Sequence, residues 1–489
     1  MGGFQGAGFD LSSLGWPSLR ACLSSAPSRR FCGMSGYASP LFLLPNMPVM
    51  QTLHLTLPFR HTPRPPPKLK AAGPGACQAP MATLLTTHPL RDTSRRTVAV
   101  SPSANRVPEL DGLRGIAIGM VVLYHAFFFN FAPRSGSALA YLLFPISIGW
   151  SGVDLFFVLS GFLIGGILLD AKDSSNYFQT FYARRFLRIV PVYYATLLCL
   201  FALSSWSRLH SGASSVWTVE SNVPWYLFVL FLHNFWMAAS NSMGSGHLAV
   251  FWSLAVEEQF YLTLPWLVRY FDRKRVMMLA IEAILLAPAL RIVCYTFWPN
   301  HTFAWFVLMP CRADALFFGV LGAVAVRDPV CKAWIGTRKN LLRSLIVFFA
   351  LGLPFVTQTH MIANGLPMVS VMLSWLAAFY LLVLLYAFSF PTSLASRCLR
   401  WAWLRWLGMI AYGMYLFHEL VLTFARNFLG AASPSNSVAR QLAVSGAAVA
   451  ITFLLASFSW IYFEKPLVQR GHRFRYEPSK TPPIASTLD

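Results

Sequence analysis

The stretch "DGLRGIAIGMVVLYHAFFF", residues 111–129, is apolar enough to cross a membrane, yet it carries an arginine near its start and a histidine eleven residues later. About 20 apolar residues make a membrane-spanning helix. In such a helix His125 lies within about 20° of the face that carries Arg114, and roughly 16 Å further along the axis. Charged and titratable groups are costly inside a bilayer and usually face the interior of a bundle. The stretch therefore predicts an all-α membrane bundle with two polar groups on an inward face.

The composition extends this prediction to the whole chain. Of 489 residues, 56% are hydrophobic and only 12% are charged, which indicates a polytopic membrane protein. The net charge of +21 comes from Lys and Arg clustered between apolar runs, as in cytoplasmic loops, so we expect no nucleic-acid partner. The eight cysteines show neither metal-ligand spacing nor a disulfide framework, so no metal is expected.

The two ends of the chain differ from its middle. Residues 1–105 are rich in Pro, Ser, Gly and Arg and cannot form a core. We interpret them as a disordered extension or as the product of a start codon placed too early, with Met81 the better beginning; a transit peptide is the alternative. The expected organisation is an extension over 1–105, a membrane domain over 106–470 and a short cytoplasmic tail over 471–489.

Hydropathy predicts about ten spans. A shorter apolar segment, residues 224–238, opens with proline and contains His233 and Asn234. If this segment does not cross the membrane, every strongly basic loop lies on one side, which the positive-inside rule makes cytoplasmic. We therefore expect both termini in the cytoplasm and an external amphipathic or re-entrant piece at 224–238. The predicted spans start near residues 113, 152, 189, 251, 276, 303, 342, 368, 406 and 440.

Asp154, at the outer end of the second span, is a candidate to orient His125, as the carboxylate does in a catalytic triad. The alternative for Asp154 is an interfacial or helix N-terminal charge. His125 could equally be a hydrogen-bonded core residue, and Arg114 an interfacial anchor whose head group reaches the membrane surface.

Three later spans add polar groups. In "FWSLAVEEQFYL" the spacing of Ser253, Glu257 and Tyr261 puts them on one face. In "CRADALFFG" Arg312 and Asp314 diverge, so each is expected to neutralise a partner on another helix. Hydrogen bonds between helices are the alternative reason for all these groups. The ninth span, "YGMYLFHEL", contributes Tyr412, Tyr415, His418 and Glu419.

The segment "FYARRFLRIVP", residues 181–191, places Arg184, Arg185 and Arg188 around one cytoplasmic helical turn. Such a cluster can clamp phosphates, which would suit a phosphorylated cytosolic donor. Ordinary positive-inside charge or lipid head-group binding is the alternative.

Taken together, these motifs resemble the acyltransferase 3 family of bacterial membrane acyltransferases. The resemblance covers residues 107–470, in order and nearly without gaps. A single motif of this kind would be weak evidence for the family, whereas seven motifs in the same order are specific to it. They are "LDGLRGIAIGMVVLYH", "GVDLFFVLSGFLIG", "ARRFLRIVPVYY", "FWSLAVEEQFYL", "CRADALFFGVLGA", "YGMYLFHE" and "YFEKPL".

The resemblance implies transfer of an acyl group, usually acetyl, from cytosolic acyl-CoA to a hydroxyl of a carbohydrate or other secondary-metabolite acceptor, often at the outer side. The partner that we expect is a glycan or glycolipid acceptor. The resemblance makes Arg114 and His125 the essential pair and puts Arg185 and Arg188 near the donor. It also implies a multi-pass protein of the bacterial inner membrane, in contact with lipids and without a tightly bound cofactor. Some relatives append a periplasmic hydrolase-like domain, which we do not expect here. The signature of the fourth span would be Ser253, Glu257 and Tyr261.

Acyl transfer to a hydroxyl needs a general base and donors for the oxyanion. Our hypothesis makes His125 the base or a transient acyl carrier, oriented by Asp154 or Glu257. Arg114 would hold the anionic end of CoA together with Arg184, Arg185 and Arg188. The remaining candidates, for contact with the substrates, are Ser253, Tyr261, Arg312, Asp314 and His418.

Two other classes of function compete with the enzyme. A transporter or flippase could use His125, Asp154, Glu257 and Asp314 as a proton relay, and inverted repeats would favour it, but none is evident between the halves of the chain. A membrane scaffold without catalysis predicts that His125→Ala folds and functions normally.

Overall fold

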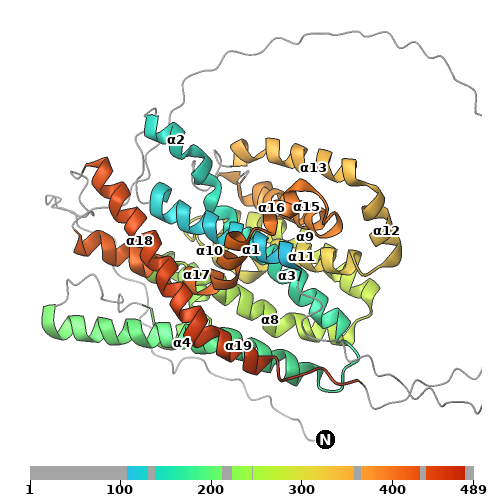
Figure 1. Cartoon of the computed structure of the whole chain (residues 1–489), viewed down its shortest axis with the longest axis horizontal. Coiled ribbons are helices and arrows are strands. Elements are labelled where there is room, and N and C mark those ends of the chain that lie inside the picture. The colour runs from blue at the N-terminus through green and yellow to red at the C-terminus, as the bar shows by residue number, and fades with distance from the viewer. Residues whose placement is uncertain are drawn as a thin grey trace, which may run out of the picture. The chain divides into compact units, whose positions relative to one another are not determined.

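The computed structural model describes residues 107–129, 138–211, 223–244, 246–356, 365–366, 368–429 and 437–478. The predicted extension over 1–105 and residues 479–489 of the predicted tail lie outside these ranges. Among the described residues the regular elements are all helices, which confirms the predicted fold class (Figure 1). Their order is α1 (Pro108–Leu123), η2 (Tyr124–Phe129), α2 (Ala138–Ser147), η3 (Ile148–Ser151), α3 (Gly152–Asp170), α4 (Tyr177–Ser211), α5 (Trp225–Val229), α6 (His233–Ser240), α7 (Gly246–Ala249), α8 (Trp252–Tyr270), α9 (Arg273–Phe297), α10 (Ala304–Val307), α11 (Met309–Ala325), α12 (Pro329–Thr337), α13 (Lys339–Leu351), η4 (Met368–Met372), α15 (Leu373–Ser389), α16 (Leu394–Leu399), α17 (Ala402–Phe428), α18 (Val438–Ser459), η5 (Trp460–Glu464) and α19 (Lys465–Gly471).

Nine helices in the described ranges are long and apolar enough to span a membrane, and they correspond to nine of the predicted spans. The remaining prediction, near residue 251, corresponds to α8, whose 19 residues reach about 28 Å. Its hydropathy is lower because it carries Glu257, Glu258 and Arg269. The chain is therefore a multi-pass membrane protein in which one helix of spanning length is unusually polar.

Residues 224–238 do not form a span. They are divided between the short helices α5 and α6, which are separated by a turn at Phe231 with a positive φ of 54°. His233 and Asn234 at the start of α6 are buried, and the Asn234 side chain donates to the Val307 carbonyl 3.1 Å away. The segment therefore packs onto the bundle as a broken helical piece.

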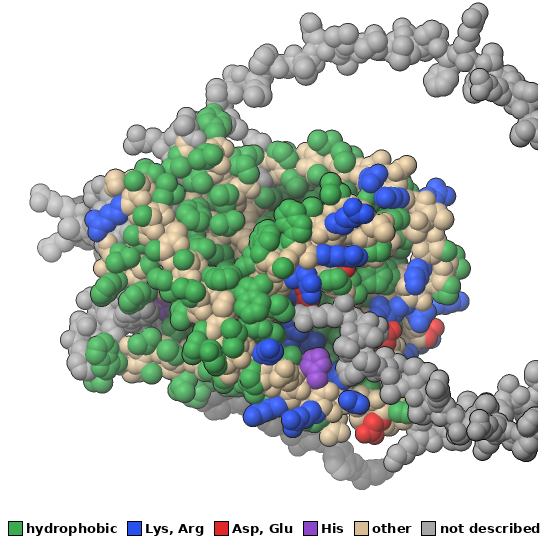
Figure 2. All heavy atoms as spheres, in the orientation of Figure 1, with side chains coloured by type: hydrophobic (Ala, Val, Ile, Leu, Met, Phe, Trp, Pro, Cys, Tyr) green, Lys and Arg blue, Asp and Glu red, His purple; other side chains and the backbone are tan. Residues whose placement is uncertain are grey.

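The outer faces of several helices are apolar and exposed, as expected for contact with lipid tails. Leu198 of α4, Leu285 of α9 and Leu351 of α13 are examples. Hydrophobic side chains cover most of the face seen in Figure 2, whereas Lys and Arg gather mainly toward one end. This separation matches a protein whose charged ends project from a membrane.

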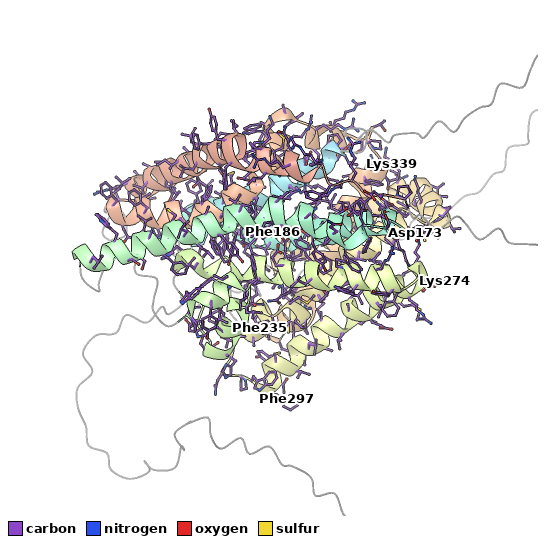
Figure 3. The ribbon with its side chains drawn as sticks, turned by 90° about the horizontal axis from the view of Figure 1, so that it is seen from below. Asp173, Phe186, Phe235, Lys274, Phe297 and Lys339 are labelled. Atoms are coloured by element: carbon purple, nitrogen blue, oxygen red, sulfur yellow. The ribbon has the colours of Figure 1, made fainter. Side chains whose placement is uncertain are left out.

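The basic loops meet at a single end of the bundle. Arg327, after α11, forms an ion pair with Asp170 at the end of α3, with 2.7 Å between Nη2 and Oδ2. The Arg327 carbonyl accepts a 3.2 Å hydrogen bond from Arg273 at the start of α9. Asp173, Lys274 and Lys339 lie at this same end in Figure 3. Because α4 leaves this end and α9 starts from it, α8 has to bring the chain back, and within the described ranges it adds a tenth crossing helix to the nine apolar ones. That this end is cytoplasmic stays a prediction.

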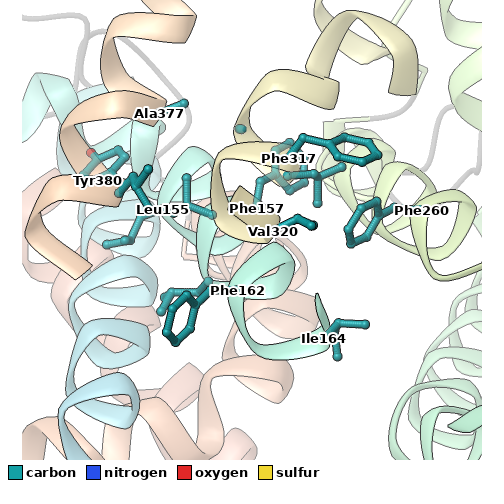
Figure 4. Packing of buried hydrophobic residues seen from close by; sticks show 14 of the residues in the cluster. Leu155, Phe157, Phe162, Ile164, Phe260, Phe317, Val320, Ala377 and Tyr380 are labelled. Carbon is teal, nitrogen blue, oxygen red and sulfur yellow. The ribbon is translucent and has the colours of Figure 1, made fainter. Parts of the chain in front are cut away.

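Glycines bring the central helices close together. A Cβ added to Gly408 of α17 would lie 1.9 Å from the Asp111 carbonyl oxygen of α1, and one added to Gly161 of α3 would lie 1.8 Å from the Leu316 oxygen of α11. Such small residues let membrane helices approach at backbone distance. The side chains that share this core include Leu155, Phe157, Phe162, Phe260, Phe317 and Val320 (Figure 4).

Candidate active site

A cavity lies among α1, α3, α4, α8, α17, η5 and α19. Its volume is about 110 Å³, whereas one water molecule needs about 10–15 Å³ on the same measure, so the cavity has room for several waters or for a thin chain. Its polar lining consists of Arg114, Ser160, Arg185, Arg188, Ser253, Glu257, Glu258, Tyr261, Tyr412, Tyr415, Trp460 and Glu464.

The charges that line this cavity balance. Three arginines face three glutamates, so the formal charges cancel when all six groups are ionised. Arg114 also has an ion pair with Asp111 of α1, at 3.4 Å, so the balance is one of formal charge and does not mean three Arg–Glu pairs. A cavity of this kind suits a neutral polar chain with amide groups better than it suits a bare polyphosphate.

The predicted face of α8 points into the cavity. Ser160 donates to Glu257 Oε1 at 2.8 Å, and Tyr261 donates to Glu257 Oε2 at 3.2 Å. Arg185 lies over the Tyr261 ring, 5.7 Å from its centroid. Ser253, one turn before Glu257, shares a 2.6 Å hydrogen bond with Tyr415 of α17. The prediction that Ser253, Glu257 and Tyr261 face the bundle interior is therefore confirmed.

The three arginines near residue 185 do not form one cluster. Arg185 and Arg188 line the cavity, but Arg184 donates from Nε to the Phe474 carbonyl at 2.8 Å and lies 5.0 Å from the centroid of the Tyr476 ring. Adjacent helical residues point about 100° apart, so Arg184 turns toward the segment after α19. We expected Arg184, Arg185 and Arg188 to act together with Arg114. The structure brings only Arg185 and Arg188 to the cavity that Arg114 also lines. The arginines lie on α4, which continues through Pro191 into the span predicted from near residue 189.

His125 lies beyond the cavity, in the π-helix η2 that continues α1. Its Nδ1 is 2.9 Å from the Val121 carbonyl oxygen, which can only accept, so Nδ1 carries the proton. Its Nε2 is 3.8 Å from Oε1 of Glu419. The sequence analysis named Glu419 as a polar residue of the ninth span but did not predict that it lies beside His125. The signal that could have indicated this is the position of Glu419 directly after His418 on α17.

His418 completes this cluster. It is fully buried, and its Nδ1 is 2.8 Å from the Tyr415 carbonyl oxygen, so Nε2 is left as the acceptor. The ring centroids of His125 and His418 are 5.1 Å apart. Tyr415, which lines the cavity, has its ring centroid 5.6 Å from that of His418. His418 and Tyr415 therefore connect the cavity to the cluster of His125, His418 and Glu419, which we call the histidine cluster.

Asp154 does not orient His125. It is fully buried and paired with Arg312 of α11, with 2.5 Å between Oδ1 and Nη2. The Arg312 guanidinium also lies over the rings of Phe157, Trp252 and Phe306. An isolated buried arginine would cost several kcal/mol, and Asp154 offsets that cost. The carboxylate beside His125 is that of Glu419, which corrects our prediction.

Asp314 has a separate partner. Arg291 of α9 donates to its Oδ2 at 2.9 Å, and Ser374 donates to the same oxygen at 2.6 Å. The prediction that Arg312 and Asp314 neutralise groups on other helices is thus confirmed, but neither lines the cavity, so their predicted contact with substrate gains no support. The four residues of the proton relay that a transporter would use do not lie together. Asp154 and Asp314 pair with arginines, Glu257 lines the cavity, and His125 lies beyond it.

Comparison with known proteins agrees with this architecture. A family model described as "Acyltransferase domain", of the acyltransferase 3 type, matches residues 107–457. No solved structure matches the chain.

Several curated proteins are similar to the chain. "Peptidoglycan O-acetyltransferase OatA" of Listeria monocytogenes is 28% identical over 394 residues, which are 76% of this chain and 57% of that protein. "Putative peptidoglycan O-acetyltransferase YrhL" of Bacillus subtilis is 28% identical over 388 residues, 75% of this chain and 56% of that protein. "O-acetyltransferase OatA" of Staphylococcus aureus is 24% identical over 415 residues, 79% of this chain and 61% of that protein.

The chain thus spans less than two thirds of the length of these relatives. The family model, in contrast, covers well over half of the chain and includes the cavity side chains up to Tyr415 as well as the histidine cluster. The protein therefore belongs to the acyltransferase 3 family.

Proposed function

We propose that the protein is an integral-membrane O-acetyltransferase of the bacterial cytoplasmic membrane, which moves an acetyl group from acetyl-CoA to a hydroxyl of a cell-envelope glycan. The names of the relatives point to peptidoglycan as the acceptor. The observation that carries the proposal is that the histidine cluster adjoins, through Tyr415, a cavity lined by Arg114, Arg185 and Arg188.

The donor would enter from the basic end of the bundle. The pantetheine arm of CoA is thin, uncharged and rich in amides, which fits the balanced charge of the cavity. The phosphates would stay at the entrance, where the segment after Glu464 supplies Lys465, Arg470 and Arg473. Arg185 and Arg188 would then contact the arm or the pyrophosphate as it passes.

The histidine cluster would perform the transfer. The acceptor hydroxyl gives its proton to His125 Nε2, while the Val121 carbonyl holds the proton on Nδ1. Glu419 stabilises the resulting imidazolium across 3.8 Å. The hydroxyl oxygen attacks the thioester carbonyl carbon, the carbon–sulfur bond breaks, and the proton on Nε2 passes to the departing CoA sulfur. Of the cavity hydroxyls, that of Tyr415 lies beside the cluster, and it would have to leave the Val250 carbonyl, its present acceptor at 2.8 Å, to stabilise the oxyanion.

The test uses purified protein in nanodiscs, acetyl-CoA labelled in the acetyl group, and a soluble peptidoglycan fraction. We expect label in the glycan with the wild type, and at least a hundredfold lower rate with His125→Ala, since a general base contributes about 10²–10⁴-fold. Glu419→Gln should also lower the rate, because the imidazolium loses the negative charge beside it. His301→Ala is the matched control, because His301 lies in the connection before α10.

Equal transfer by His125→Ala and the wild type would remove His125 from the mechanism. If a folded wild type transfers no label from any short acyl-CoA to any envelope glycan, the proposed function fails and the transporter hypothesis gains support.

A further inference from the structure

The histidine cluster brings three ligand atoms together. One atom each from His125, His418 and Glu419 lies within 4.8 Å of the other two. The His418 side chain is fully buried, and the side chains of His125 and Glu419 are 17% and 12% exposed. Two imidazoles and a carboxylate, held on η2 and α17, thus converge at a shielded point.

All three atoms are lone-pair acceptors. The backbone carbonyls of Val121 and Tyr415 take the Nδ1 protons of His125 and His418, which leaves the lone pairs on Nε2. Within the described part of the chain, neither His418 Nε2 nor Glu419 Oε1 has a hydrogen-bond partner, although both atoms are buried. Buried acceptors without a donor are costly, so the arrangement favours a positively charged group at its centre.

The geometry fits a metal ion of the zinc class. Zinc binds imidazole nitrogen and carboxylate oxygen at about 2.0–2.2 Å, which puts two tetrahedral ligands about 3.4 Å apart. His125 Nε2 and Glu419 Oε1 are 3.8 Å apart, so a small side-chain movement would suffice. The carbonyls on both Nδ1 atoms are the outer partners that usually fix metal-binding histidines.

We propose that His125, His418 and Glu419 bind a divalent zinc-class ion, and that this ion excludes the acceptor hydroxyl. The competition rests on the proposed function, because the ion would use the same Nε2 lone pair of His125 that has to take the substrate proton. Zinc would therefore be a reversible inhibitor of the transfer.

Binding is tested first, without reference to activity. Untagged protein, or protein with a tag free of histidine, is stripped with chelator, and its zinc stoichiometry and Kd are measured by competition with a chromogenic chelator. The cobalt-substituted protein supplies a visible spectrum. We expect one site per chain and at least a tenfold weaker Kd for Glu419→Gln and for His418→Gln, a variant that keeps most of the side-chain volume. His301→Ala should bind as the wild type does.

No zinc bound above the level of the stripped buffer, or unchanged binding by folded Glu419→Gln and His418→Gln, would overturn the site. Melting curves of each variant identify the folded samples. Transfer activity is then measured with and without zinc. Zinc binding in a protein that transfers no acetyl group would sink the proposed function but keep the site, whereas full activity at saturating zinc would overturn the competition.

Discussion

Asp154 and Arg312 are each buried by the bundle and neutralised by the other. Asp154→Asn leaves the Arg312 cation without its carboxylate, and breaking a buried pair in this way costs about 3–5 kcal/mol. We expect a clear drop in thermal stability in detergent, measured by fluorescence-detected size exclusion. Asp154→Leu combined with Arg312→Met removes both charges and should recover most of the loss. An Asp154→Asn protein that is as stable as the wild type but inactive would instead support a direct catalytic role.

Arg188 and Arg184 lie one turn apart on α4 but differ in their surroundings, since only Arg188 lines the cavity. If the cavity holds the donor, Arg188→Ala should raise the KM for acetyl-CoA at least tenfold, because a hydrogen bond from a charged group contributes about 1.5–3 kcal/mol. Arg184→Ala should change KM less than threefold. Steady-state kinetics with a fixed glycan acceptor checks both values, and equal effects of the two variants would argue against this donor path.

At the residue scale, the sequence predicted which polar side chains face the interior better than it predicted which side chains they contact. Arg114 could be placed on an inward face because α1 is regular as far as Leu123. His125 falls in η2, where π-helical geometry changes the direction of side chains, so its neighbours could not be predicted from the α-helical period. Glu419 was missed as its partner because that pairing depends on how α17 docks against α1, which hydropathy does not specify.

At the scale of elements, α1 offers a test of its packing. A Cβ on Gly115 would lie 2.1 Å from the Leu404 carbonyl oxygen of α17, whereas a Cβ on Gly119 would meet nothing within 4 Å. Gly115→Ala should therefore push α17 away and lower the yield of monodisperse protein. Gly119→Ala should be neutral or slightly stabilising, because alanine is more favourable than glycine inside a helix by about 1 kcal/mol. Similar yields and melting temperatures for the two variants would contradict the close approach of α1 and α17.

The spans themselves were predictable because each apolar run matches the thickness of a bilayer. The residues at which the spans begin and end were harder to predict. The second span is preceded by α2 and η3, so its apolar helical stretch begins at Tyr141 and not near residue 152. The helix α8 was predicted as a span like the others, although its polarity keeps it out of the nine most apolar helices and it packs against α3, α6 and α11. The neighbours of a helix depend on packing between segments that are far apart in the chain, and hydropathy and spacing do not predict that packing.

At the scale of the whole bundle, the ends of the helices divide by charge. The ion pair of Asp170 and Arg327 and the hydrogen bond from Arg273 tie three connections together at one end. The entrance proposed for the donor lies at this end, so the mechanism requires it to face the cytosol, where CoA is found. The positive-inside rule predicts the same orientation from the distribution of charge.

That orientation can be measured across α9 alone. Lys274 lies in the first turn of this helix and Asn300 lies just after its end, and both are exposed. In a background with the eight native cysteines replaced by serine, a membrane-impermeant maleimide should label Asn300→Cys in intact spheroplasts, but Lys274→Cys only after permeabilisation. The physical reason is the positive-inside rule, since Lys274 lies between Arg273 and Arg275 at the basic start of α9. The reverse pattern would place the basic end outside, would separate the cavity entrance from cytosolic CoA, and would rule out the proposed path of the donor even if the protein acetylates glycans.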